Sequence, residues 1–406
     1  MTRRTVAVFT GNRAEYGLQF PILRAIDAHP GLDYRLIVSG AHLDDNFGRT
    51  LAEIERDGFT VHDEVQIDLE SDTLYATAKA IGTGVCSMAE ALARARPDIL
   101  VVYADRFEGF AAVVAGTQMS VPTAHVEGGD ITEGGALDDS VRHAMTKLAH
   151  LHFTTNQQAT NRVLAMGEEA WRVHTVGFPA IDLIADGILA SEAELLEKYG
   201  LDPARPILIF TQHSVTTEFE AADAQIEPAL EAVERLAEDG VQNILTYPNN
   251  DAGGRRIIRR LEAFMVGERA NIQLHKSLGR YDYHGLLALA GRPEYKVACA
   301  GNSSSGIKET PAFGCPTINI GSRQRGRLRA DNVIDVGYDA GEIYAAARRC
   351  FEEEAFRRSC RDCDNPYGIG DAGKKIAEVL SKVPLDANLI QKRMTLRGET
   401  EDGWFR

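Results

Sequence analysis

HVEGGDITEGGALDDSVRHAMTK, residues 125–147, is the stretch around which the predicted fold is organised. A short β-type run over residues 123–126 leads Glu127 directly into glycines, and a helix is predicted to restart at Asp138. In an open α/β sheet, ligands bind beyond the carboxyl ends of the strands. Paired carboxylates there can hold different pKa values, so that one acts as acid and another as base. Asp138 also fits an ordinary helix cap, but Glu127 ends a strand, and we interpret the stretch as a site.

Composition narrows the class of protein. The 406 residues suffice for two domains of ordinary size. The formal net charge of −15 disfavours nucleic acid and anionic membranes as partners. No apolar run approaches the roughly 18 residues of a membrane span, and the run after Arg4 is too short for a secretory signal. The six scattered cysteines are typical of a reduced, cytoplasmic enzyme, and the CxxC at 360–363 lacks a second ligand pair.

Strands and helices alternate along most of the chain, which predicts parallel sheets with right-handed crossovers. The predicted strands cover residues 5–10, 34–39, 99–103, 123–126, 151–155, 173–176, 207–210, 244–247, 272–275, 296–299 and 317–320. A Gly-Phe-Pro sequence at 177–179 marks a joint between two α/β halves of comparable length. Polar side chains follow the strands in both halves, and we expect the two sheets to present their carboxyl ends to one cleft.

The loop at 301–306, GNSSSG, is predicted to lie between a strand and a helix over 306–313. Exposed backbone N–H groups and a helix end at such a place suit a phosphate. The loop has neither the P-loop nor the GxGxxG spacing, and a plain turn is an equally good interpretation. Glu309 fits a ribose contact or a solvated helix face, and Arg323 fits a pyrophosphate contact. His213, just after a strand, fits a phosphate contact, a proton shuttle or a structural role.

Taken together, the strand-end segments resemble the UDP-N-acetylglucosamine 2-epimerase family, and specifically its hydrolysing branch of sialic and legionaminic acid pathways. The segments that carry the resemblance are GNRAEY (11–16), SGAHL (39–43), ADRFE (104–108), HVEGG (125–129), DDSVRHAMTKLAH (138–150), TQH (211–213), PNND (248–251), GNSSSGIKE (301–309), GCPTINIGSRQRGR (314–327) and NPYGIG (365–370). The resemblance implies a GT-B architecture of two Rossmann-like domains with the active site in the cleft between them. The expected domains are residues 1–180 and 181–385, with the last helix crossing back, followed by a polar tail at 386–406.

The resemblance also implies roles for individual residues. The implied catalytic residues are Asp105, Glu127, Asp138 and His213. The implied sugar or diphosphate contacts are Arg13, His42, Arg106 and Asn249. The implied nucleotide site consists of Ser303, Ser304, Gly306, Glu309 and Arg323, with backbone near Leu278 offered to the base.

The implied reaction needs no cofactor and no metal. A base removes the C2 proton of UDP-N-acetylglucosamine, or of a UDP- or GDP-linked diacetamido-dideoxy relative, while the diphosphate leaves. Water then adds to the glycal and yields a free 2-epimeric sugar of the N-acetylmannosamine type. Asp105 and Glu127 are expected to exchange protons at C2, with Asp138 assisting. The resemblance further implies a homodimer or homotetramer. The alternatives are a non-hydrolysing epimerase, a GT-B glycosyltransferase and a catalytically silent nucleotide-sugar sensor.

Overall fold

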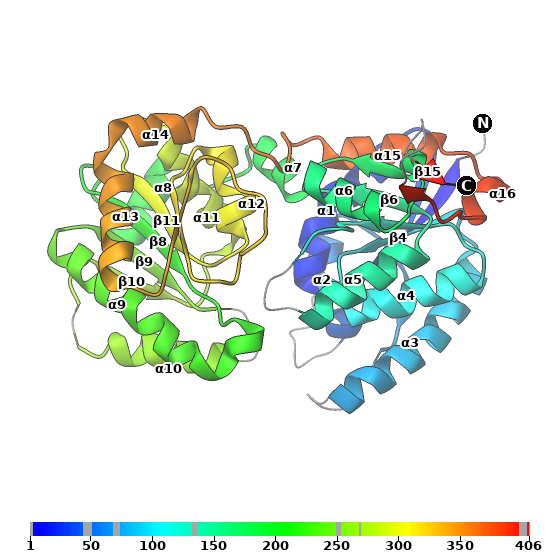
Figure 1. Ribbon diagram of the computed structural model, residues 1–406, viewed down its shortest axis with the longest axis horizontal. Coiled ribbons are helices and arrows are strands. Elements are labelled where there is room, and N and C mark those ends of the chain that lie inside the picture. Colours follow the sequence, from blue (N-terminus) through cyan, green and yellow to red (C-terminus); the bar gives the residue numbers. More distant parts are fainter. Residues whose placement is uncertain are drawn as a thin grey trace. The chain divides into compact units, whose positions relative to one another are not determined.

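The computed structural model describes residues 3–43, 51–67, 74–131, 136–248, 253–267, 269–397 and 404–405. The chain divides into two compact units, coloured along the sequence in Figure 1. Unit 1 consists of Met1–Asp130, Leu137–Leu183 and Tyr367–Arg406, and unit 2 consists of Ile131–Ala136 and Ile184–Pro366. Each unit is an α/β layer structure built on one parallel sheet.

Unit 1 holds a seven-stranded sheet in the order β3-β2-β1-β4-β5-β6-β7. Its strands are β1 (Arg4–Thr10), β2 (Leu32–Ser39), β3 (Val61–Val65), β4 (Ile99–Tyr103), β5 (Thr123–Val126), β6 (Leu151–Thr154) and β7 (Val173–Thr175). All of them pair in parallel. The strand order reverses between β1 and β4, and ligands of doubly wound sheets bind at such a reversal.

The helices of unit 1 cover both faces of this sheet (Figure 1). They are α1 (Arg13–Asp27), α2 (Leu51–Arg56), α3 (Leu74–Ala95), α4 (Phe107–Gln118), α5 (Ala136–Leu148), α6 (Gln157–Ala165), α7 (Ala180–Ala185), α15 (Ala372–Lys382) and α16 (Ala387–Ile390). The late helix α15 packs against α1. Arg4 donates to the carbonyls of Leu380 (2.9 Å) and Val383 (2.7 Å). The two ends of the described chain therefore belong to one core.

Unit 2 holds a six-stranded sheet in the order β10-β9-β8-β11-β12-β13. Its strands are β8 (Ile207–Thr211), β9 (Gln242–Thr246), β10 (Ile272–His275), β11 (Val297–Gly301), β12 (Thr317–Ile320) and β13 (Val333–Val336). Its helices are α8 (Glu192–Tyr199), α9 (Ala222–Glu238), α10 (Gly254–Phe264), α11 (Gly279–Ala288), α12 (Ser305–Lys308), α13 (Ala340–Glu352) and α14 (Glu354–Arg361). Here the strand order reverses between β8 and β11.

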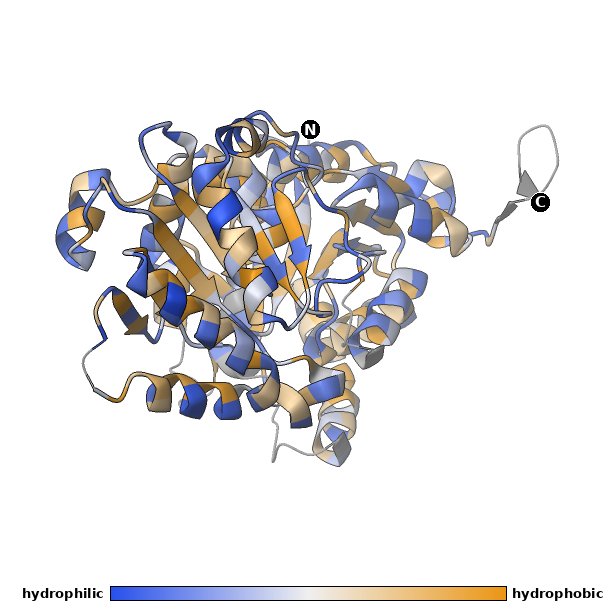
Figure 2. Cartoon of the chain, turned by 60° about the vertical axis from the view of Figure 1, so that its left-hand side comes forward, coloured by the Kyte–Doolittle hydropathy of each residue, from blue (hydrophilic) through white to orange (hydrophobic). Residues whose placement is uncertain are grey.

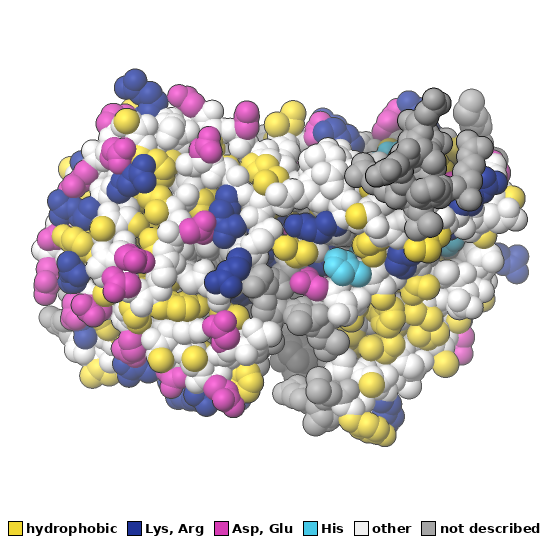
Figure 3. Space-filling view, in the orientation of Figure 1, with side chains coloured by type: hydrophobic (Ala, Val, Ile, Leu, Met, Phe, Trp, Pro, Cys, Tyr) yellow, Lys and Arg dark blue, Asp and Glu magenta, His cyan; other side chains and the backbone are white. Residues whose placement is uncertain are grey.

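The central strands are apolar on both faces, as Figure 2 shows by their colour. Every residue of β4 and β11 is buried, because helices cover both sides of a parallel sheet. On the face seen in Figure 3, hydrophobic side chains gather over α3 and α4 of unit 1. Phe107 and Phe110 of α4 are partly buried and pack against one hydrophobic core of unit 1. No helix in the described part of the chain is both long and apolar enough to cross a bilayer.

The predicted α/β class with two Rossmann-like domains is confirmed, but some predicted elements are wrong. Strands β3 and β13 were missed, because VHDEV and VIDV are short and carry charged residues. The helix predicted over 306–313 ends at Lys308, and a 3₁₀ turn follows over Thr310–Phe313. Pro311 explains the break, since it has no N–H for an α-helical hydrogen bond and its ring crowds the preceding turn.

Candidate active site

The ends of β4 and β5 in unit 1 are aligned and strained. Tyr103 pairs with Val126 in the parallel ladder. The next residue on each strand is left-handed without being glycine: φ is 53° at Ala104 and 66° at Glu127. Such backbone costs about 1–3 kcal/mol per residue and gathers at functional sites. The two turns place Asp105 and Glu127 at one edge of the sheet.

Hydrogen bonds over-determine these strained turns. The Ala104 N–H donates to the Val126 carbonyl (3.0 Å), and the Glu127 N–H donates to the Phe153 carbonyl (2.8 Å). The imidazole of His125 lies with Nε2 2.7 Å from the Ala104 carbonyl and Nδ1 3.0 Å from Thr146 Oγ1. Burial lowers the pKa of His125 to about 3, so this histidine is neutral and stabilises the turn through its two hydrogen bonds.

Arg142 of α5 joins the two turns. Its side chain is buried; Nη2 forms an ion pair with Asp105, and Nη1 donates to the Glu127 carbonyl at 3.2 Å. Burial alone would lower the pKa of this guanidinium, but the neighbouring carboxylates, Asp105 and then Glu127, outweigh it and raise the pKa. Because a buried charge without a partner is costly, Arg142 holds Asp105 in place.

The glycines of HVEGG are required by close packing. Gly129 has φ 74°, and a Cβ there would lie 2.3 Å from the Ala159 carbonyl oxygen of α6. A Cβ on Gly128 would lie 2.9 Å from Thr146 Oγ1. A side chain at either position would displace the segment that follows Glu127.

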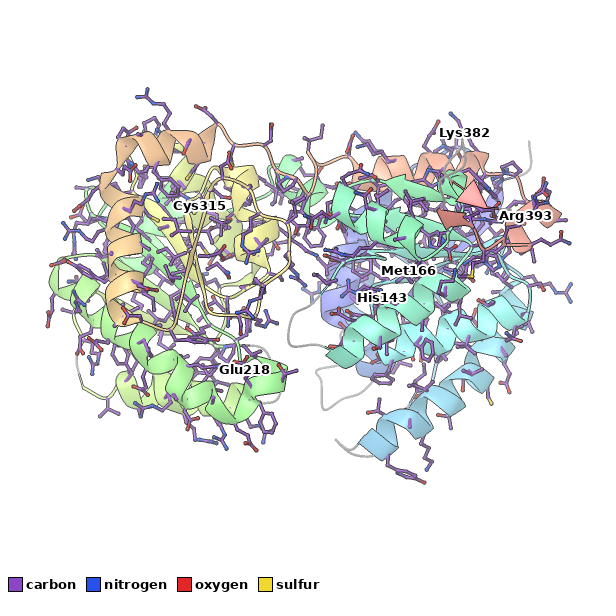
Figure 4. All side chains as sticks on the ribbon, viewed as in Figure 1. His143, Met166, Glu218, Cys315, Lys382 and Arg393 are labelled. Atoms are coloured by element: carbon purple, nitrogen blue, oxygen red, sulfur yellow. The ribbon has the colours of Figure 1, made fainter. Side chains whose placement is uncertain are left out.

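Asp138 does not cap α5, as the sequence had allowed. The helix begins at Ala136, so Asp138 lies inside its first turn, where a carboxylate suits the positive helix end. Its side chain is exposed. Five residues further along α5 is His143, labelled in Figure 4 and partly buried. The structure thus groups Asp105, Glu127 and Arg142, with Asp138 four residues before Arg142 on the same helix.

Two buried glutamates lie in the first turns of α1 and α4, the helices that follow β1 and β4. Glu15 and Glu108 are 4% and 2% exposed. Glu15 Oε2 accepts the Gly11 N–H at 2.6 Å, and Glu108 pairs with Arg106 at 3.4 Å. Burial, followed by the neighbouring Glu108, raises the pKa of Glu15 to about 8 despite the Gly11 hydrogen bond. Sequence patterns missed this pair, because both acids lie in the first turn of a helix, where acidic residues are common.

The expected sugar and diphosphate contacts fare differently. His42 is fully buried with Nε2 3.1 Å from Thr10 Oγ1, and burial lowers its pKa to about 4. Arg106 is half-exposed and immediately precedes α4. Arg13 is the first residue of α1, but its side chain lies outside the described part, as does Asn249 entirely. These roles stay predictions.

In unit 2, Asn302 organises the loops that follow three adjacent strands. Its Oδ1 accepts the His213 N–H at 2.6 Å, and its Nδ2 donates to the His213 carbonyl at 2.8 Å. The Asn302 carbonyl accepts from Arg323 (3.1 Å) and Gln324 (2.8 Å). Preceding it, Gly301 has φ 122°, and a Cβ there would lie 1.9 Å from the Thr211 carbonyl oxygen. His213 and Arg323 therefore meet at one residue that sequence analysis did not single out.

The predicted nucleotide residues surround the short helix α12. Ser303 and Ser304 precede it and are partly exposed, whereas Gly306 is buried, where a Cβ would lie 3.2 Å from Thr317 Cγ2. Glu309 caps the carboxyl end of α12 and lies 2.9 Å from His284 Nε2. The helix has only four residues, so its dipole contributes less than the sequence predicted. Leu278 precedes α11 and is partly buried.

Among the residues that the structure describes, no group of three or more histidine, cysteine or acidic side chains is arranged to hold a metal ion. The cysteines of the CxxC lie on α14 and just after it. Burial raises the pKa of Cys360 to about 12 and also raises that of Cys363. Neither thiol has the depressed pKa of a redox-active cysteine.

Comparisons with known proteins assign the family. The sequence model of the family described as UDP-N-acetylglucosamine 2-epimerase matches residues 24–381. The chain belongs to this family. It is 31% identical to the UDP-N,N'-diacetylbacillosamine 2-epimerase (hydrolyzing) of Legionella pneumophila, over 96% of this chain and 98% of the relative. It is also 31% identical to the GDP/UDP-N,N'-diacetylbacillosamine 2-epimerase (hydrolyzing) of Campylobacter jejuni, over 82% and 85%.

Solved structures agree on the fold. The UDP-GlcNAc 2-epimerase of Neisseria meningitidis, bound to UDP-GlcNAc, matches with a TM-score of 0.72 and 17% identity over 93% of this chain and 99% of that one. The S. aureus MnaA–UDP structure matches with a TM-score of 0.74 and 20% identity over 93% and 96%. The predicted family membership is therefore confirmed, as is the GT-B-like fold.

Proposed function

We propose that the protein is a hydrolysing nucleotide-sugar 2-epimerase. Its substrate is UDP-N-acetylglucosamine, or a UDP- or GDP-linked 2,4-diacetamido-6-deoxy relative. The products are a nucleoside diphosphate and a free 2-epimeric amino sugar. The relatives at 31% identity, whose names describe hydrolysing epimerases, support this branch of the family.

One observation carries the proposal: Asp105 and Glu127 lie on adjacent strand ends and share Arg142. Epimerisation at a ring carbon requires a proton to leave from one face and another to arrive on the opposite face. Two carboxylates on neighbouring turns supply two such groups. Asp138, exposed in the first turn of α5, assists the glycal or the incoming water.

The proposed reaction is balanced without a redox partner. A carboxylate takes the C2 proton, the C–H electron pair forms the C1–C2 double bond, and the C1–O bond breaks towards the diphosphate. Water then adds its oxygen to C1 while a carboxylic acid delivers a proton to the other face of C2. Positive groups near the leaving diphosphate stabilise its developing charge; we assign this role to Arg323, His213 and the Ser303–Ser304 turn of unit 2.

The test is product analysis by mass spectrometry after turnover of UDP- and GDP-sugars in heavy water. We expect a free sugar with one deuterium at C2 and one equivalent of nucleoside diphosphate. Deuterium at C2 of a sugar still attached to its nucleotide would mean a non-hydrolysing epimerase. A free or transferred sugar without deuterium would mean simple hydrolysis or glycosyl transfer, and nucleotide binding without any product would mean a sensor.

Subunit assembly belongs to the proposal as well. We infer a homodimer or homotetramer in the cytoplasm, and hydrophobic side chains over α3 and α4 (Figure 3) offer a surface for association. Light scattering on the purified chain tests this, and a monomer at micromolar concentration would contradict it.

A further inference from the structure

Two consecutive residues of α11 hold the two ends of α12. The Ser305 hydroxyl donates to the phenol oxygen of Tyr283 at 2.8 Å. The Nε2 of His284 lies 2.9 Å from Glu309 Oε2. Ser305 is the first residue of α12 and Glu309 is its carboxyl-terminal cap. Tyr283 and His284 therefore contact this short helix at its two ends.

The imidazole of His284 is enclosed. It is 3% exposed, and its ring lies 5.4 Å from that of Phe313 and 6.0 Å from that of Tyr283. The side chain of Glu309 is 17% exposed. A buried N–H therefore donates to one oxygen of a carboxylate that solvent still reaches.

This hydrogen bond makes the two oxygens of the Glu309 carboxylate inequivalent. Oε2 of Glu309 is occupied by His284, while Oε1 has no hydrogen bond to any residue in the described ranges. A carboxylate whose rotation is already stopped loses less conformational entropy when it binds a hydroxyl. Outer hydrogen-bond partners that orient a ligand-binding side chain are well known from metal sites, where ligating carboxylates are themselves hydrogen-bonded.

We propose that His284 is a positioning residue that presents Glu309 Oε1 to a ribose hydroxyl of the nucleotide, while Tyr283 positions Ser305 in the adjoining turn. The inference rests on the proposed function, because it requires a ribonucleotide as ligand. The ribose contact of Glu309 is the expectation from the sequence, and the inference adds the residue that orients its carboxylate, His284. The two α11 residues then act on different parts of the same nucleotide.

The experiment measures dissociation constants by calorimetry for UDP, 2'-deoxy-UDP and 3'-deoxy-UDP on the full chain. His284→Leu removes the donor at similar volume and should weaken UDP about tenfold, which corresponds to about 1.4 kcal/mol. At least one deoxy nucleotide should be weakened less than twofold, because it lacks the hydroxyl that Glu309 accepts. His284→Gln restores an N–H donor and should recover most of the affinity for UDP.

Matched variants separate positioning from general stability. His275→Leu removes another partly buried histidine of unit 2, whose Nε2 lies 3.2 Å from Gln273 Oε1, and should leave all three affinities unchanged. Tyr283→Phe deletes only the phenol oxygen and should weaken all three nucleotides equally, about threefold. If His284→Leu does not fold, as judged by circular dichroism, His284→Asn takes its place, since its shorter amide does not reach Glu309.

The outcomes are distinguishable. An equal loss for all three nucleotides in the His284 variant, or no loss, overturns the positioning role while leaving the proposed function intact. A wild-type chain that binds none of the three overturns both. Turnover gives a second measurement: a positioning role raises KM and leaves kcat unchanged, because Glu309 contacts no reacting atom in the proposed reaction.

Discussion

The two units place opposite kinds of chemistry at the carboxyl ends of their sheets. In unit 1 the strand-end turns hold carboxylates and guanidinium groups, with Arg142 buried against Asp105. In unit 2 the corresponding turns are joined by hydrogen bonds centred on Asn302, whose partners are backbone groups of His213, the Gln324 amide and the Arg323 guanidinium. A carboxylate can accept or release a proton in a reaction, whereas an amide or a guanidinium binds a ligand without exchanging one. We propose on this basis that unit 1 performs the reaction and unit 2 retains the nucleotide, and each prediction below tests this division.

The largest effect is expected for Glu127→Gln. Because an amide cannot take or give the C2 proton, kcat should fall about a thousandfold while the dissociation constant for UDP stays within a factor of two. Steady-state kinetics and calorimetry measure the two quantities. Glu90→Gln, an exposed change on α3, serves as control. A Glu127 variant that lost UDP binding instead would assign nucleotide retention to unit 1.

Arg142→Met should be the most destabilising of these changes, at about 3 kcal/mol, because it leaves the carboxylate of Asp105 without its buried partner. Denaturant titration followed by circular dichroism measures the loss. The matched control is Arg94→Met, whose pairing with Asp63 is largely exposed on the arginine side and should cost less than about 1 kcal/mol. Equal losses in the two variants would show that the buried ion pair of unit 1 contributes no more to stability than an exposed one.

Glu15→Gln should remove a pH dependence from unit 1. The folded pKa of Glu15, about 8, lies above its usual 4.5, so between these values the folded chain keeps a proton that the unfolded chain has released. Stability should therefore fall as pH rises from 4.5 to 8 and stay level above 8. The facing charged groups are Glu108, Arg106 and Asp105.

Glutamine has no proton to lose, so the unfolding free energy of the Glu15→Gln variant should rise relative to that of the wild type across this window, with the full difference reached above pH 8. Unfolding free energies at pH 5, 7 and 9 measure the gain. Parallel curves for the two proteins would mean that Glu15 is ionised in the folded state throughout.

The smallest effect is expected in unit 2, for Ser303→Ala. The Ser303 hydroxyl accepts the Ser305 N–H at 3.4 Å, and its loss from a phosphate-holding turn should raise KM about threefold with kcat unchanged. Initial-rate kinetics measure both constants. A fall in kcat without a change in KM would place part of the chemistry in unit 2 and remove the contrast between the units.

Whether a feature of the candidate site could be predicted from the sequence depends on how far apart in the chain its interacting residues lie. Glu127 was found because a buried run, an acid and two glycines stand next to one another in the chain. Arg142 lies only fifteen residues away, yet its link to Asp105 requires two elements to meet in space. Glu15 and Glu108 were missed for the same reason: each is ordinary in its own helix, and only their shared burial is unusual.

Unit 2 shows the same limit. The GNSSSG loop was recognised, but the reciprocal bonds between Asn302 and His213 join residues that are 89 positions apart. Local composition also overestimated α12, because a proline three residues beyond its end stops the helix in a way that hydrophobic periodicity does not register. Sequence therefore predicts which turns contribute to the candidate site, while tertiary contacts decide which atoms of those turns are already hydrogen-bonded within the protein.

The return of α15 to unit 1 has a consequence for biosynthesis. Residues of unit 2 through Pro366 form an almost uninterrupted segment, which can acquire its structure as soon as it leaves the ribosome. The amino-terminal strands are made first, but α1 is covered only after Tyr367 and the residues that follow it have been made. Only then can Arg4 donate to the carbonyl of Leu380. We therefore expect unit 2 to fold before unit 1 during synthesis, and a nascent chain stalled before Ala372 should expose α1 to chaperones.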